Sequence, residues 1–513
     1  MDFLQNISPR EYQKRIFENC KEQNCLVVLP TGLGKTLIAL MLAIDRLKKS
    51  PLQKIVFLAP TKPLAEQHLN SFQKNLPGLF ADMQLFTGSV KPEQRKKIFQ
   101  TADIIFSTPQ CIANDIKKDL YNLKEVSLLI EDEAHRCIKN YDYNFVAQKY
   151  KTQSENPLIL GLTASPGSDT KKIQAICKNL SIQKVELRTR DSEDVKNYLQ
   201  ELEFEKINVD FPPELEEIRQ VLVNLIEQYI EELKYRRILY GPPTKFNLIE
   251  LQKKIMGTLA RGNKNFNYML GASACAQAIK LHHALELLET QTLASFNKYL
   301  KELFNQASKK QSKGVVKLVA KQEFNFVYML SSELLSKEQE HPKLKKLFEI
   351  TEKNFSKDKK IIIFTQFRET AKTISEKINK IKYIKSKVFV GQAMKNGLGL
   401  NQKQQKKIIE DFSEGRINVL VATSIAEEGL DIPEVSEVIF YEPIPSAIRA
   451  IQRAGRTARL SKGKLIMLIT KKTRDETFFY ASKARQKKMK TAIEGIQKNL
   501  DAGIKFDEQK NLT

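Results

Sequence analysis

Long apolar runs are missing from this chain of 513 residues, although 42% of its residues are hydrophobic. The longest runs, such as 361–364 and 465–469, have the length of a β-strand and are flanked by Lys, so they are too short to cross a bilayer. Residues 1–10 contain no apolar core of the kind that a secretory signal needs. We therefore expect a soluble cytoplasmic protein of two or three domains with no membrane partner.

Paired cysteines are missing as well. The chain has six Cys, and none of them forms a C-x-x-C pair or a His/Cys cluster with the spacing of a zinc site. We therefore expect no metal site with cysteine ligands. The thiols are expected to be reduced and mostly buried.

Negative charge is scarce relative to positive charge. The chain has 84 Lys and Arg against 60 Asp and Glu, a net charge of +24. Such a surplus favours a polyanionic partner, because Lys and Arg that neutralise phosphates release counterions. Heat-adapted proteins can also be Lys-rich, so charge alone does not decide between these interpretations.

Short apolar runs alternate with amphipathic stretches in two parts of the chain. In the first part the runs are 25–29, 55–59, 103–107, 128–130 and 158–162. In the second part they are 361–365, 387–390, 419–422, 438–441 and 465–469. Each run is apolar throughout, as strands buried on both faces of a parallel sheet are. We predict an α/β protein with two doubly wound parallel-sheet lobes, at 1–205 and 336–485.

The segment between the lobes has helical periodicity instead. Apolar residues recur every three or four positions over 218–233 and again over 293–303. We predict a helical insertion at 206–335 whose apolar stripes form its core. The basic cluster Lys234, Arg236 and Arg237 is either a solvated face or a nucleic-acid contact. Residues 486–513 are expected to form a last helix and a tail.

A phosphate-binding loop follows the first predicted strand. The sequence PTGLGKT at 30–36 lies between that strand and an apolar helix, so it can present backbone N–H groups to the phosphates of ATP. Lys35 adds positive charge, and the Thr36 hydroxyl can bind Mg²⁺. Leu29 stands where the strict motif has Gly, so the loop is a shortened form of that motif. The residues expected to bind ATP here are Thr31, Gly32, Gly34, Lys35 and Thr36.

Two adjacent carboxylates end the strand at 128–130, in the DEAH box formed by residues 132–135. Asp132 is placed to hold Mg²⁺, and Glu133 is placed to orient and deprotonate the attacking water. Upstream of the first strand, Arg10 and Gln13 are further candidates for the nucleotide site. The Gln13 side-chain amide can read the adenine edge.

The second half of the chain supplies arginines. The run 452–459 contains three Arg with helical spacing, which can point at one polyphosphate. Arginine fingers stabilise the charge of phosphoryl transfer and are worth about 10³–10⁵ in rate. Because the first lobe has no comparable cluster, hydrolysis should depend on lobe closure, the physical basis of a motor.

Loops after other predicted strands combine hydroxyls, amides and fixed turns, groups that hold phosphates without reading bases. The candidates for nucleic-acid contact are Pro60, Thr61, Lys62, Thr108, Gln366, Arg368 and Thr423. Gly429 permits close backbone contact with nucleotide or nucleic acid. Thr163 and Ser165 are predicted to relay between the γ-phosphate site and the nucleic-acid face.

These motifs resemble superfamily 2 helicases, and among them the archaeal Hef family, relatives of the Fanconi anaemia M and Mph1 helicases. The resemblance rests on Pro60–Leu64, Asp132–His135, Gly161–Gly167 and Ala422–Arg459, and it extends over nearly the whole chain. It implies that the two lobes are RecA-like. It also implies ATP-dependent unwinding or remodelling of forks, flaps and Holliday junctions in DNA repair, with 3′-to-5′ polarity. The insertion would act as a thumb that grips duplex DNA, and an archaeal, nucleoid-associated location follows.

The resemblance also implies roles for single residues. Lys35 and Thr36 would bind phosphate and Mg²⁺, and Asp132 and Glu133 would run hydrolysis. The fingers would be Arg456 and Arg459, the coupling residues Gln452 and His135, and the ribose contact Asp431.

Two departures from the family pattern limit these expectations. Ala458 stands where many relatives have Gly, which affects the placement of Arg459. An XPF-like nuclease with helix–hairpin–helix repeats does not appear before Thr513, so no nuclease activity is expected. A separate nuclease or repair protein is therefore a candidate partner.

Two alternative functions stay open. A double-stranded RNA-activated ATPase of the Dicer and RIG-I-like type has a similar insertion, and the motifs do not detect the 2′-OH. An ATP-gated scaffold that binds junctions is the other, although it would not need the complete set of Glu133, Arg456 and Arg459.

Overall fold

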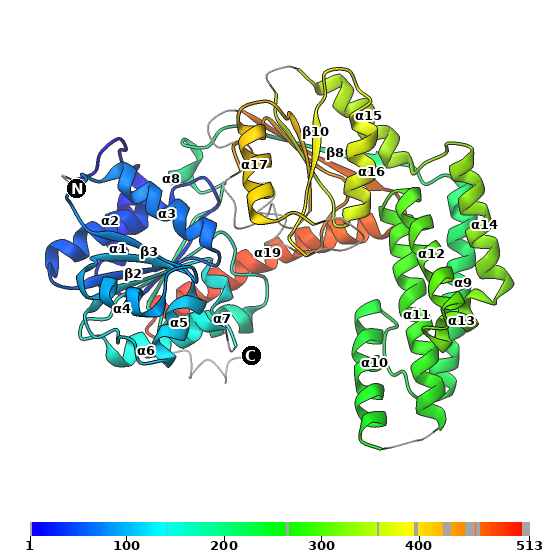
Figure 1. The fold of residues 1–513 in the computed structure, drawn as a ribbon, viewed down its shortest axis with the longest axis horizontal. Helices are drawn as coiled ribbons and strands as arrows, with labels where there is room; N and C mark the ends of the chain where they lie inside the picture. The colour runs from blue at the N-terminus through cyan, green and yellow to red at the C-terminus, as the bar shows by residue number, and fades with distance from the viewer. Residues whose placement is uncertain are drawn as a thin grey trace.

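A computed structural model gives the fold of residues 3–139, 141–262, 266–356, 359–393, 399–423, 432–446, 457 and 462–504. Two α/β lobes and a bundle of helices lie side by side, with the second lobe in the middle. One long helix runs beneath both lobes (Figure 1). The predicted α/β class with a helical insertion is confirmed. No helix in these ranges is long and apolar enough to cross a membrane.

The first lobe is built on a parallel seven-stranded sheet with the order β3-β4-β2-β5-β6-β1-β7. Its strands are β1 Cys25–Val28, β2 Lys54–Leu58, β3 Met83–Phe86, β4 Ile104–Ser107, β5 Val126–Asp132, β6 Ile159–Thr163 and β7 Lys184–Leu187. All five predicted strands are present. The two that the sequence did not predict, β3 and β7, are the edge strands, which are only partly buried and so lack a continuous apolar run.

Helices cover both faces of this sheet. They are α1 Glu11–Cys20, α2 Lys35–Lys49, α3 Lys62–Asn75, α4 Pro92–Thr101, α5 Pro109–Lys117, the 3₁₀ turn η1 Ala134–Arg136, α6 Asp142–Gln153, α7 Thr170–Asn179 and α8 Glu193–Lys196. Successive residues of β1 face opposite sides, so Cys25 and Val27 belong to one core and Leu26 and Val28 to the other. All six Cys are buried and free.

The second lobe has a parallel six-stranded sheet with the order β10-β11-β9-β12-β13-β8. Its strands are β8 Leu202–Val209, β9 Ile361–Phe364, β10 Ser386–Phe389, β11 Val419–Ala422, β12 Glu437–Phe440 and β13 Gly463–Thr470, and its helices include α15 Pro342–Asn354, α16 Arg368–Ile378 and α17 Gln402–Ser413. β8 pairs with β13 over its full length. The boundary expected between residues 205 and 206 therefore falls inside an edge strand of the second sheet.

The insertion is a bundle of α9 Pro213–Tyr235, α10 Lys245–Ala260, α11 Phe266–Thr290, α12 Leu293–Ser308, α13 Lys313–Val319 and α14 Gln322–Ser336. Its predicted apolar stripes are buried together, among them Ile218, Leu225, Phe296 and Leu300. The bundle stands beside the second lobe, and the C-terminal ends of α9 and α10 and the start of α11 project away from it (Figure 1).

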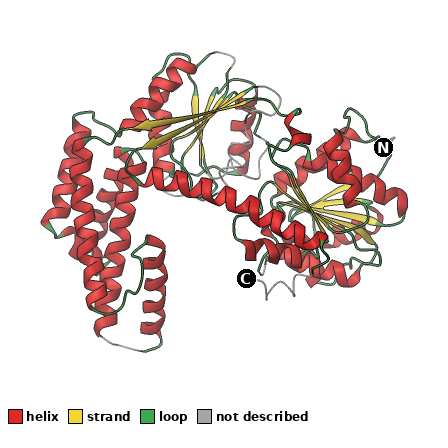
Figure 2. Cartoon of the chain, turned by 180° about the vertical axis from the view of Figure 1, so that it is seen from behind, coloured by secondary structure: helices red, strands yellow, loops and turns green. Residues whose placement is uncertain are grey.

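The helix α19 Arg474–Asp501 joins the two lobes. Phe479 near its start packs in the core of the second lobe, whereas Met489, Ile493 and Ile496 pack in the core of the first. Seen from behind, it runs as one continuous helix along both sheets (Figure 2). The boundary expected at residue 486 thus lies within a single helix that is part of both lobes.

A buried ion pair fixes the start of α19. Lys343 Nζ lies 2.7 Å from Asp475 Oδ2, and neither side chain is exposed. The same ammonium donates to the Thr290 carbonyl at the end of α11, also at 2.7 Å. Lobe two, the insertion and α19 therefore meet at one lysine.

Candidate nucleotide site and nucleic-acid interface

The phosphate-binding loop connects β1 to α2, as predicted from the sequence. Gly32 and Gly34 have φ values of +85° and +79°, in the left-handed region that favours glycine. The Lys35 ammonium donates to the Leu29 carbonyl at 2.9 Å, which holds its positive charge within the loop. The Thr31 hydroxyl is buried and has no hydrogen-bond partner in the part of the chain that the structure describes. The loop thus combines a fixed cation with a polar atom able to accept a new partner.

Gln13 lies directly against this loop. Its Nε2 donates to the Leu33 carbonyl at 3.0 Å, and its Oε1 accepts from the Arg10 backbone N–H at 2.8 Å. A side chain at Gly34 would collide with the Gln13 amide. The Arg10 guanidinium lies over the Tyr198 ring, 5.1 Å from its centroid. Both ends of the Gln13 amide are therefore bound to backbone, and its contact with adenine stays a prediction.

The two candidate catalytic carboxylates lie at the carboxyl end of β5, beside the loop. Asp132 is the last residue of the strand, and Glu133 follows it with a φ of +54°. Burial by itself raises the pKa of Asp132, but the hydrogen bond and charge of His68, with the charge of Lys35, outweigh it and hold the pKa below its usual value. Asp132 is therefore an anion beside the lysine of the phosphate loop.

His68, from α3, is a residue of this site that the sequence analysis missed. Its Nε2 lies 2.9 Å from Asp132 Oδ2, and its Nδ1 lies 3.4 Å from the Thr36 hydroxyl. The ring packs against Phe57, with centroids 4.4 Å apart. No local signal marks it: α3 follows β2, and only the sheet order, with β2 next to β5, brings its first turns near Asp132.

The site suits a magnesium ion. Thr36 and Asp132 offer a hydroxyl and a carboxylate oxygen on either side of one imidazole ring, and oxygen is the ligand type that Mg²⁺ prefers. Mg²⁺ commonly takes only one or two protein ligands and completes its shell with water and phosphate. No cluster of three or more His, Cys, Asp or Glu with metal-site geometry occurs among the described residues.

The three predicted coupling residues are in contact with one another. His135 Nδ1 lies 3.2 Å from Glu133 Oε2 and 3.2 Å from the Thr163 hydroxyl. The Thr163 hydroxyl also accepts from the Ser165 backbone N–H at 3.1 Å. Beyond the prediction, the Ser165 hydroxyl lies 2.9 Å from Met489 Sδ on α19. The chain of contacts from Glu133 therefore reaches the helix that joins the two lobes.

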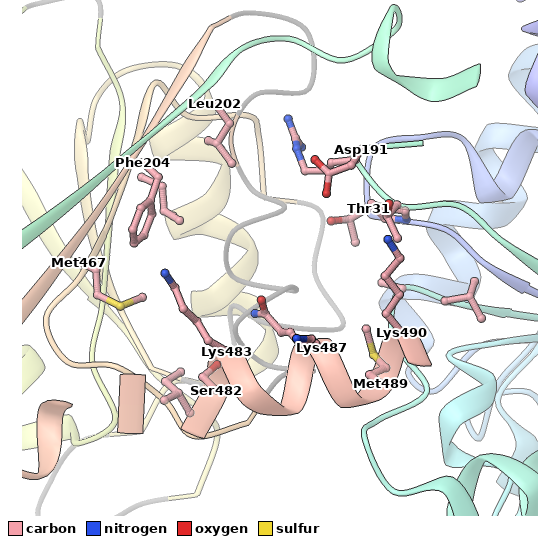
Figure 3. A pocket seen from close by; sticks show the side chains of 18 of the residues that line it. Thr31, Asp191, Leu202, Phe204, Met467, Ser482, Lys483, Lys487, Met489 and Lys490 are labelled. Atoms are coloured by element: carbon pink, nitrogen blue, oxygen red, sulfur yellow. The ribbon is translucent and has the colours of Figure 1, made fainter. Parts of the chain in front are cut away.

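A cavity of about 610 Å³ separates the lobes beside the phosphate loop. Thr31 and Asp191 of the first lobe face Phe204 and Met467 of the second across it, and α19 closes one side with Lys483, Lys487 and Lys490 (Figure 3). The loop that is expected to hold ATP thus opens toward the second lobe. The second-lobe candidates Gly429, Asp431, Gln452, Arg456 and Arg459 lie outside the described residues.

The predicted nucleic-acid contacts fall into three separate groups. Pro60, Thr61, Lys62 and Thr108 follow β2 and β4, which are neighbours in the first sheet. Gln366, Arg368 and Thr423 follow β9 and β11, which are neighbours in the second. Lys234, Arg236 and Arg237 lie apart from both groups, at the end of α9, where Arg236 pairs with Glu232 at 3.0 Å.

Comparison with known proteins agrees with this architecture. The DEAD/DEAH box helicase family matches residues 10–173, and the helicase conserved C-terminal domain matches residues 342–461. An ATP-dependent RNA helicase helical bundle matches residues 214–338. The crystal structure of the Pyrococcus furiosus Hef helicase domain is 42% identical, covers 94% of this chain and 100% of its own, and gives a TM-score of 0.71. The chain belongs to the Hef helicase family. It carries the two lobes of an ATP-driven helicase.

Longer relatives share this region. The Methanocaldococcus jannaschii protein named "Putative ATP-dependent RNA helicase MJ1505" is 39% identical over 96% of this chain and 61% of its own length. The ATP-dependent DNA helicase fml1 of Schizosaccharomyces pombe is 32% identical over 97% of this chain and 60% of its own length. The Fanconi anemia group M protein homolog of Mus musculus is 31% identical over 96% of this chain. The chain thus spans about 60% of the first two curated relatives that it matches.

Proposed function

We propose that this chain is an ATP-dependent DNA helicase or translocase that unwinds or remodels branched DNA, such as forks, flaps and Holliday junctions. The observation that carries the proposal is the series of contacts from Glu133 through His135, Thr163 and Ser165 to α19. A carboxylate that activates water is thereby joined to a helix anchored in both lobes. Relatives that match 97% and 92% of this chain are named ATP-dependent DNA helicases.

Each lobe has its own part in the proposed cycle. Lys35 and the loop backbone hold the phosphates, Thr36 and Asp132 hold Mg²⁺, and Glu133 orients and deprotonates the attacking water. Arg456 and Arg459 would complete the site from the second lobe, and Gln452 would couple the nucleotide state to lobe closure. Hydrolysis and release would then open and close the lobes on DNA.

The cellular setting follows from the substrate. A motor that remodels branched DNA works at the replication fork, so we infer a nucleoid-associated role in an archaeal cell. A separate nuclease or repair protein would process the remodelled DNA.

A substrate panel tests the proposal. ATPase rate and strand displacement are measured with forked DNA, a four-way junction, linear duplex DNA and duplex RNA. Forked or four-way DNA should stimulate hydrolysis most. The name of the Methanocaldococcus jannaschii relative favours RNA as the second candidate, and stronger stimulation by duplex RNA would replace the DNA proposal with that one.

Glu133→Gln separates a motor from an ATP-gated scaffold. This change should abolish strand displacement while ATP and DNA binding persist; remodelling that survives it would favour the scaffold. Glu131→Gln is the matched control. Burial raises the pKa of Glu131 to about 8, so its carboxyl is already neutral at pH 7 and an amide replaces it without a change of charge.

A further inference from the structure

Exposed apolar side chains gather at the projecting end of the helical insertion. Tyr235 and Phe266 are 89% and 69% exposed, and Met256 and Met269 are 54% and 51% exposed. Large apolar side chains left in water in such a group usually mark a binding surface. The surface formed by Tyr235, Phe266, Met256 and Met269 is called the aromatic end below.

The two aromatic residues share one end of the bundle although 30 positions separate them. Tyr235 is the last residue of α9, and Phe266 is the first residue of α11. The residues next to them are joined, because Arg236 Nη1 donates to Asn267 Oδ1 at 3.3 Å. α10 ends at Ala260, shortly before Phe266. The C-terminal ends of α9 and α10 and the start of α11 point away from both lobes (Figure 1).

The charge around the aromatic end fits a polyanion. Residues 234–269 contain eight Lys or Arg and a single acidic residue, Glu250. Lys234 comes directly before Tyr235, and Arg237 lies two positions after it. Both are exposed and form no ion pair with any residue that the structure describes. Cations beside exposed rings are the combination that binds single-stranded nucleic acid, because the cations bind phosphates and the rings stack on bases.

We propose that the aromatic end is a stacking surface for unpaired bases at a DNA branch point, with Tyr235 and Phe266 as the stacking rings. The inference rests on the proposed function, since a branch is where unpaired bases meet duplex. Fully paired DNA offers no free base face. The aromatic end would therefore distinguish a fork with unpaired arms from linear duplex.

The test combines protein variants with altered DNA. Tyr235→Ala with Phe266→Ala removes both rings and leaves every charge in place. Phe326→Ala with Met329→Ala is the matched control, because these exposed side chains lie on α14 of the same bundle. A second fork carries abasic sites at the unpaired nucleotides next to the branch, which removes the bases and keeps the phosphates.

The expected result is a roughly five- to hundredfold loss of fork affinity in the Tyr235/Phe266 variant, the range for one stacked base. The abasic fork should weaken wild-type binding by a similar factor and cause no further loss in the variant. Affinity for linear duplex and the dependence of log K on log salt should stay unchanged, because no phosphate contact is lost.

The stacking inference would be overturned if the variant bound the fork as tightly as wild type, or if abasic sites still weakened its binding. The aromatic end would then be a binding surface for a protein partner. A wild-type chain that binds fork and duplex DNA equally would instead overturn the proposed function. The basal ATPase rate of the variant should equal that of wild type, which shows that both lobes remain folded.

Discussion

His68 Nε2 lies 2.9 Å from Asp132 Oδ2 and orients the carboxylate that is expected to hold Mg²⁺. The other ring nitrogen reaches the Thr36 hydroxyl, so one imidazole contacts both proposed ligands of the ion. Side chains that hold metal ligands in place typically contribute 10- to 100-fold to metal affinity.

Replacement of His68 should therefore raise the Mg²⁺ requirement for nucleotide binding. His68→Ala is expected to increase the Mg²⁺ concentration for half-maximal binding of a fluorescent ATP analogue by roughly 10- to 100-fold. His68→Gln keeps a hydrogen-bonding group and should recover part of the loss. His283→Ala, in the insertion, is the control; an equal change in the control and in His68→Ala would contradict a positioning role.

The contact between His135 and Thr163 should couple DNA binding to hydrolysis. Thr163→Val keeps the shape of the side chain but removes the hydroxyl that contacts His135 and accepts from Ser165. One neutral hydrogen bond contributes about 1 kcal/mol, so the DNA-stimulated ATPase rate should fall roughly five- to tenfold. Basal hydrolysis and ATP affinity should be retained, as they should in Thr152→Val, an exposed site on α6. Equal loss of basal and stimulated rates would exclude coupling.

The buried pair of Lys343 and Asp475 should be sensitive to removal of one partner. Lys343→Met leaves an uncompensated carboxylate in the core and is expected to lower the free energy of unfolding by about 3–5 kcal/mol. Adding Asp475→Leu should restore much of that loss, since both charges are then gone. Urea unfolding of the single and double variants measures both effects. A double variant no more stable than the single would show that the ion pair is not the cause.

Acid should destabilise the junction of α11 with α19 through His282. Burial, followed by the charges of Arg474 and Lys245, lowers the pKa of His282 to about 4. Its Nδ1 accepts from Arg474 Nη2 at 3.0 Å. Because the pKa of His282 is lower in the folded protein than in the unfolded chain, the unfolded chain binds a proton first as the pH falls. The neutral ring therefore contributes fully to the free energy of unfolding above pH 6.5, and this contribution is lost as the pH falls toward 4.

His282→Gln should remove this part of the acid sensitivity. Each pKa unit corresponds to about 1.4 kcal/mol, so wild type should lose roughly 2–3 kcal/mol more than the variant between neutral pH and pH ~4. Unfolding free energies measured across that range give the difference directly, because all other groups titrate in both proteins. Parallel curves would show that His282 does not titrate there.

The basic cluster at the end of α9 should contribute electrostatically to fork binding. Lys234→Glu with Arg237→Glu is expected to weaken binding and to flatten the slope of log K against log salt by roughly two, about one per lost phosphate contact. Lys149→Glu, exposed on α6, is the control. An unchanged slope would make this cluster a solvated face.

The sequence by itself determined the local parts of the site. The loop at 30–36, the carboxylates after β5 and the strands buried on both faces follow from contiguous residues, because backbone conformation and burial on both faces leave their pattern in short segments. The helical insertion was also predicted from the sequence, since its apolar residues recur with the period of a helix.

Only the tertiary structure decided which distant segments meet. His68 reaches Asp132 because β2 and β5 are neighbours in the sheet. β8 joins the second sheet as an edge strand, and α19 packs in the cores of both lobes. The local sequence of each element gives only a weak indication of these positions. Contacts of this kind depend on strand order and on packing between lobes, which no single stretch of residues encodes.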